Sequence, residues 1–140
     1  MQGTLIQGHR VASGMAADCP WPGGSVARQL PLMARHGVPV DELYAGTLNI
    51  ALDCTDVPYP SQFEFDFVLD WRSPDKPTHF RLHALKVYFE GAEYLGWSYR
   101  KIYPEGFVSR HPQPSNVIEI LAPKVSGIQY GDAVSVKFNN

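Results

Sequence analysis

Most of the motifs that identify a known chemistry are missing from this sequence. It has no C-x-x-C or paired Cys/His spacing for zinc, no G-x-x-x-x-G-K-[ST] or G-x-G-x-x-G phosphate loop, and no G-x-S-x-G nucleophile turn. Its five histidines are scattered, and none belongs to a recognisable Ser/His/Asp motif. These absences argue against a zinc domain, the common nucleotide-binding folds and a serine hydrolase.

Cysteine, net charge and long apolar runs are also scarce. The only cysteines, Cys19 and Cys54, lie far apart, and we expect no disulfide framework. A net charge of −2 gives no global attraction to nucleic acid or to an anionic membrane. No apolar run approaches the roughly 18 residues that span a bilayer, and the start of the chain does not read as a signal peptide. We therefore expect a cytoplasmic protein.

Turn-forming residues are plentiful instead. The chain has 140 residues with 12 Gly and 12 Pro, and 44% of its residues are hydrophobic. This composition is typical of one globular domain, residues 1–140, with many short β-elements. Apolar runs and apolar alternation predict strands at about residues 4–11, 46–52, 62–70, 78–89, 92–102, 117–121 and 134–138. The sequence thus predicts a mainly β fold, a barrel or a closed, Greek-key-like sheet, with one short helix.

The helix is predicted from about Ser25, a plausible N-cap, to His36. Pro31 should kink or split it, and Gly37 is a good stop. In the strand at 78–89 the apolar phase changes halfway, which predicts a bulge or a sharp bend.

One predicted strand carries two polar residues in its apolar run. Thr47 and Asn49 in "GTLNIAL" are two residues apart and so point to the same face. Their neutral oxygens suit Mg²⁺ when phosphates supply the negative charge, and Gly46 would let a ligand approach the backbone. The alternative is that both side chains simply face solvent.

Two further stretches are candidates for binding. The glycine-bearing stretch 11–25 could cradle phosphates with backbone N–H groups at the start of the helix, or it could be a plain connection. Glu119 lies inside the apolar stretch 117–121, so it lies either on a wet face or buried with a partner. In a functional role, Glu119 would form a hydrogen bond to a ligand or act as a base that accepts a hydroxyl proton.

In combination these stretches resemble the archaeal CTP-dependent riboflavin kinases over nearly the whole chain. The resemblance is carried, in matching order and approximate spacing, by "VASG" at 11–14, "AGTLNIAL" at 45–52, "SNVIEILAP" at 115–123 and "GIQYGDAVSV" at 127–136. It implies a six-stranded cradle-loop barrel with one or two short helices. It also implies phosphoryl transfer from CTP to the 5′-hydroxyl of riboflavin, giving FMN.

The resemblance also implies roles for individual residues. By the family pattern Thr47 and Asn49 hold Mg²⁺, and Glu119 contacts the flavin or takes the substrate hydroxyl proton. Catalysis would then be mainly positioning and charge neutralisation.

The nucleotide side departs from the family pattern. The family has a compact S-G-x-G-x-G loop, of which this chain keeps Ser13 and Gly14. Gly23 and Gly24 are candidates for the same work from a shifted position, and Lys124 is the cation left after the "IEILAP" strand. The altered loop leaves a second reading open: a barrel that binds a flavin, a nucleotide or another phosphorylated molecule without phosphoryl transfer. Under either reading we expect small-molecule ligands, no nucleic acid and no membrane, and a monomer or small homo-oligomer.

Overall fold

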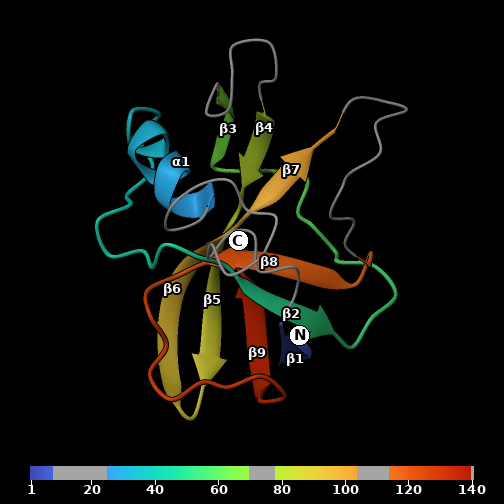
Figure 1. Cartoon of the computed structure of the whole chain (residues 1–140). Helices are drawn as coiled ribbons and strands as arrows, with labels where there is room; N and C mark the ends of the chain where they lie inside the picture. The colour runs from blue at the N-terminus through green and yellow to red at the C-terminus, as the bar shows by residue number, and fades with distance from the viewer. Residues whose placement is uncertain (8–24, 70–77, 104–113, 140) are drawn as a thin grey trace.

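The computed structural model describes residues 1–7, 25–69, 78–103 and 114–139 (Figure 1). Its elements are β1 (Gln2–Ile6), α1 (Ser25–Ala34), β2 (Leu48–Leu52), β3 (Phe65–Leu69), β4 (Thr78–Leu82), β5 (Ala84–Phe89), β6 (Ala92–Ser98), β7 (Arg100–Ile102), β8 (Val117–Leu121) and β9 (Ala133–Phe138). Among these residues no helix is both long and apolar enough to cross a membrane.

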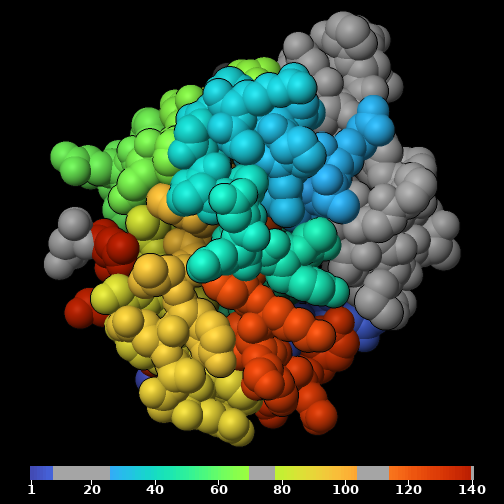
Figure 2. All heavy atoms as spheres, turned by 90° about the vertical axis from the view of Figure 1, so that its left-hand side faces the viewer, coloured from blue at the N-terminus to red at the C-terminus, as the bar shows by residue number. Residues whose placement is uncertain are grey.

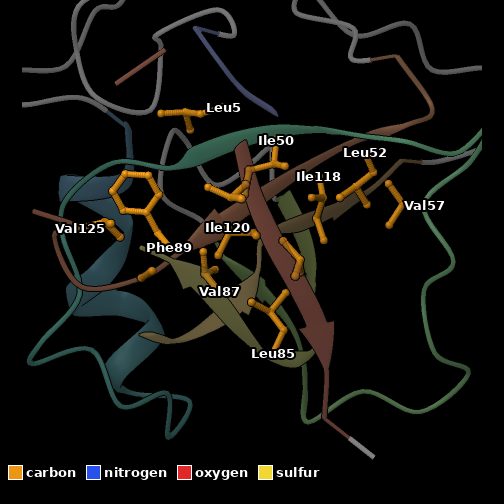
Figure 3. Close-up of a cluster of buried hydrophobic side chains, with 13 residues drawn as sticks. Leu5, Ile50, Leu52, Val57, Leu85, Val87, Phe89, Ile118, Ile120 and Val125 are labelled. Atoms are coloured by element: carbon orange, nitrogen blue, oxygen red, sulfur yellow. The ribbon is translucent and has the colours of Figure 1, made fainter. Parts of the chain in front are cut away.

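Six of the strands close into a barrel. Their order is β1-β2-β8-β6-β5-β9, with antiparallel pairing at every seam. Alternate residues of each strand point inward, so side chains such as Ile50, Val87 and Ile120 meet in the interior (Figure 3). The predicted mainly β fold, a closed six-stranded barrel with a short helix, is confirmed.

A second layer lies on one side of the barrel. It is a three-stranded sheet of order β3-β4-β7, which we call the upper sheet, and α1 packs beside it (Figure 1). Apolar side chains of α1, β3 and β4 form a second core, which reaches down to Leu121 of β8. The space-filling view shows the residues that follow α1 lying between the helix and the C-terminal strands (Figure 2). The sequence patterns did not separate this sheet from the barrel.

The two sheets share one long hairpin that breaks at His83 and Tyr99. Residues 78–82 belong to the upper sheet and residues 84–89 to the barrel, so the predicted bend in strand 78–89 is confirmed at His83. The returning strand, predicted as continuous over 92–102, instead divides into β6 and β7 at Tyr99. Ser98 fixes the break: its N–H donates to the His83 carbonyl at 2.9 Å, and its hydroxyl accepts the His83 N–H at 3.0 Å.

The helix shows how local signals compete with packing. α1 continues through Pro31 and ends at Ala34, two residues before the predicted end. Because proline lacks an N–H, Pro31 costs the helix one hydrogen bond. The buried face, which includes Val26, compensates with packing in the second core. Gly37 is the predicted stop: its φ is +91°, and the Val38 N–H reaches back to the Met33 carbonyl at 3.3 Å.

Several strand ends differ from the predicted bounds. β1 begins at Gln2, two residues earlier than predicted, and residues 8–11 of the predicted strand lie outside the described part of the chain. β3 begins at Phe65, three residues later than predicted, because Gln62 and Phe63 precede the pairing with β4. β8 has the predicted bounds, and Cys54 is a free, exposed thiol.

The shortest seam of the barrel, between β6 and β8, generates a prediction. It has two register pairs, and a Cβ placed on Gly96 would lie 2.6 Å from the Leu121 carbonyl oxygen. Gly96→Ala should therefore lower the free energy of unfolding by about 1–3 kcal/mol in urea denaturation. Gly91→Asn is the control, because nothing lies within 4 Å of that position and asparagine tolerates its φ of +78°. Equal stability of the two variants would contradict this account of the seam.

Candidate functional site

The candidate residues Asn49 and Glu119 face each other across the seam between β2 and β8. The register pairs Asn49 directly with Glu119, so their side chains share one face of the sheet. Their neighbours Ile50 and Ile118 point into the barrel core, which puts Asn49 and Glu119 on the outer face. Residues 70 positions apart in sequence thus form one polar pair.

Thr47 joins this pair from the residue before β2. The Asn49 amide Nδ2 donates to the Thr47 Oγ1 at 3.4 Å, so the two side chains lie on the same face, as their spacing predicted. A cation held here would take the Thr47 hydroxyl and the Asn49 carbonyl oxygen, which requires the amide to turn by half a rotation. Within the described ranges no three His, Cys, Asp or Glu side chains are grouped for a metal. The oxygens of Thr47 and Asn49 fit Mg²⁺ in kind, provided that water and ligand phosphates complete the shell.

The site lies at the margin of the second core. Asn49 is only 7% exposed although it is on the outer face of the barrel, and Glu119 is half-buried. Leu121, two residues after Glu119 on the same face, belongs to the second core. Neither Asn49 nor Glu119 is therefore an ordinary polar residue on a fully wet strand face.

The chain after β2 is tied to the start of β8. The Val57 N–H donates to the Ser115 carbonyl and the Ser115 hydroxyl to the Thr55 carbonyl, both at 2.9 Å. These bonds hold Val57 beside the residues that lead into the strand carrying Glu119.

The aromatic ring of Tyr59 contacts a cation. The Arg100 guanidinium stacks over the Tyr59 ring at 4.3 Å from the centroid. Burial raises the pKa of the Tyr59 hydroxyl; the positive charge of Arg100 opposes this rise and the negative charge of Glu119 adds to it. Tyr59 therefore lies within electrostatic reach of both charged groups.

His83 lies between β4 and β5, where its ring bonds to Pro60 and Ser98. Its Nε2 lies 3.2 Å from the Pro60 carbonyl, which can only accept, so Nε2 carries the proton. Nδ1, 3.0 Å from the Ser98 hydroxyl, is then the acceptor. Burial lowers the pKa of His83, and the nearby Arg100 lowers it further, against a rise from the Pro60 hydrogen bond. His83 is thus a neutral, structural histidine.

The predicted nucleotide-binding residues are only partly described. Ser13, Gly14, Gly23 and Gly24 lie outside the described residues. Lys124 is exposed in the segment between β8 and β9. The Ala122 carbonyl, two residues before it, accepts the Tyr44 N–H at 2.9 Å, which keeps the chain before Lys124 beside the chain before Thr47.

Comparison with known proteins adds no family assignment: no model of a protein family matches the chain, and neither does any curated protein. The fold and site define a small closed β-barrel with a half-buried polar cluster of Thr47, Asn49 and Glu119 on its outer face.

Sequence reasoning did not select Tyr59, His83 or Arg100. Tyr59 lies in a stretch without periodicity, and Arg100 is one of two adjacent basic residues in the predicted strand 92–102. The phase change at 78–89 was the one local signal, and it pointed to the bend at His83 without indicating its partners.

The lowered pKa of His83 predicts how stability depends on pH. In the unfolded chain a histidine titrates near pH 6.5, whereas the folded protein resists protonating His83. As pH falls below about 6.5 the unfolded state takes up this proton first, so stability is lost until the pH passes the folded pKa. His83→Gln should show a shallower loss between pH 7.5 and 5, measured by urea denaturation. An unchanged slope would mean that another group governs this pH range.

Proposed function

We propose that this protein transfers a phosphoryl group from a nucleoside triphosphate, CTP by its resemblance, to the 5′-hydroxyl of riboflavin in a Mg²⁺-dependent reaction. One observation carries the proposal: Asn49 lies opposite Glu119 across β2 and β8, with Thr47 hydrogen-bonded to Asn49 on the same face. These are the three residues to which the resemblance gives the metal and the acceptor hydroxyl. Their meeting on a closed six-stranded barrel, the fold that the resemblance implies, supports the proposal.

The roles of the three side chains follow from their chemistry. Thr47 and Asn49 would offer neutral oxygens to Mg²⁺, which neutralises phosphate charge when it is bound. The Glu119 carboxylate would accept a hydrogen bond from the acceptor hydroxyl, or its proton as the oxygen bonds to the γ-phosphorus and the nucleoside diphosphate leaves. Partial burial of the site strengthens such charge interactions relative to water. Most of the rate enhancement would come from alignment of donor and acceptor.

A binding role without phosphoryl transfer is the second candidate. It is favoured by the departure of the 13–25 stretch from the compact glycine loop of the family. In that case the barrel would bind a flavin, a nucleotide or another phosphorylated small molecule at the same face.

An assay of product formation separates the two functions. The purified protein is mixed with riboflavin, Mg²⁺ and one of CTP, ATP, GTP or UTP, and FMN is measured by chromatography. We expect FMN with at least one donor, CTP first, and none when EDTA removes the metal. Absence of FMN with every donor, together with measurable binding of riboflavin or nucleotide, would favour the binding role.

A double variant tests the metal assignment. Thr47→Ala/Asn49→Ala removes both neutral oxygens and should reduce Mg²⁺-dependent FMN formation by at least about 100-fold, since metal charge stabilises the transition state by several kcal/mol. Ser135→Ala on the outer face of β9 is the control and should keep full activity. Circular dichroism checks the fold, because Asn49 is buried. Retained activity in the folded double variant would refute the metal assignment.

A further inference from the structure

Tyr99 extends the row of candidate residues by one strand. Its N–H donates to the Glu119 carbonyl at 2.7 Å, which continues the register of the seam between β6 and β8 and places the two residues side by side. Asn49 lies on the other side of Glu119, across β2 and β8. The Tyr99 ring is buried in the second core together with Leu121, so it points to the outer face of the barrel wall. That face therefore carries a row of Asn49, Glu119 and Tyr99.

A lysine lies on this same face. Because side chains alternate along a strand, Lys101 shares the side of Tyr99, whereas Arg100 between them points to the opposite side, where it lies over the Tyr59 ring. The register of the upper sheet agrees: Lys101 is the partner of Phe80, which is fully buried in the second core. Two registers thus place Lys101, and not Arg100, on the side of the candidate site.

An aromatic ring keeps the Lys101 ammonium close to this row. Its Nζ lies 5.3 Å from the centroid of the Tyr99 ring, and Lys101 is half-buried. The ring itself is fixed, because the Tyr99 hydroxyl donates to the Gln29 Oε1 of α1 at 2.5 Å. Diagonal neighbours on one face of a sheet, such as Lys101 and Glu119, lie about 7–8 Å apart, which a long side chain can span. The ammonium therefore lies beside the neighbour of Glu119.

The three candidate residues bring no positive charge of their own. Thr47 and Asn49 are neutral and Glu119 is acidic, whereas a triphosphate carries more negative charge than one Mg²⁺ neutralises. A lysine ammonium is a common phosphate ligand in proteins. Over an aromatic ring it keeps its charge, and its three N–H groups can donate to several acceptors. Lys101 thus has the charge that a phosphate-binding site on this face needs.

We propose that Lys101 binds a phosphate group of the ligand beside Asn49 and Glu119. The inference rests on the proposed function for the identity of the ligand. It adds a cation on the sheet face itself to Lys124, which the sequence suggested and which is exposed in the segment after β8. The Lys101 ammonium would neutralise phosphate charge that the metal leaves, and the Tyr99 ring would keep it in place.

Titration calorimetry of binding tests this role without requiring turnover. Inorganic triphosphate, CTP with Mg²⁺, and riboflavin are titrated into the wild-type protein, Lys101→Met, Lys101→Arg and two controls. We expect Lys101→Met to weaken binding of the two phosphate-bearing probes about tenfold or more, because a charge-assisted hydrogen bond is lost. Its binding of riboflavin, which has no phosphate, should not change. Lys101→Arg keeps the charge and should bind more tightly than Lys101→Met.

The controls remove a positive charge elsewhere. Arg100→Gln changes the adjacent residue, whose side chain points to the opposite face, and Lys137→Met changes an exposed lysine of β9. Both should bind the phosphate-bearing probes as the wild type does. Circular dichroism checks that each variant is folded.

The outcomes separate this inference from the proposed function. If the wild type forms no FMN but Lys101→Met weakens triphosphate binding more than both controls do, the anion role stands and catalysis fails. If the wild type forms FMN while Lys101→Met binds triphosphate as tightly as the controls, the anion role alone is overturned. Equal weakening by Arg100→Gln, equal weakening of riboflavin binding, or no binding of either phosphate-bearing probe to the wild type also overturns it. Should Lys101→Met fail to fold, Lys101→Gln replaces it in the same comparison.

Discussion

The hydrogen bond from the Tyr99 N–H to the Glu119 carbonyl, 2.7 Å long, is the contact on which the architecture depends. It continues the short seam between β6 and β8 that closes the barrel. At the same residue the chain leaves the barrel for the upper sheet. The Tyr99 side chain is buried in the second core, where its hydroxyl donates to the Gln29 Oε1 of α1 at 2.5 Å. Barrel, sheet and helix thus meet where Glu119 is held.

The site depends on having a core on each side of the barrel wall. Inward residues of β2 and β8 pack in the barrel interior, and Leu121 on the outer face packs under the upper sheet. Asn49 and Glu119 lie between the two cores, where Asn49 is buried and Glu119 is half-buried. A wall buried on one face alone would leave both side chains in water, where their interactions with a charged ligand would be weak. The second layer therefore keeps the polar pair partly out of water, which its proposed role requires.

Local patterns were sufficient for the position of most strands and for part of the site. The apolar stretch 117–121 gave β8 its bounds, the phase change at 78–89 gave the bend, and Gly37 gave the helix stop. The i, i+2 spacing put Thr47 and Asn49 on one face. The division at Tyr99 was not predictable, because it arises from pairing with β8, and Pro31 does not break α1, because packing offsets the lost hydrogen bond. The nucleotide-binding roles of Ser13, Gly14, Gly23 and Gly24 remain predictions.

The sequence by itself determined a mainly β fold, its turns and the shared face of Thr47 and Asn49, because each of these depends on periodicity or on residues close in the chain. Only the tertiary structure decided that Glu119 lies opposite Asn49, and that Arg100 lies over the Tyr59 ring. Such contacts depend on strand register and on which strands become neighbours. Register is fixed by the packing of the whole barrel and not by any one stretch of the chain.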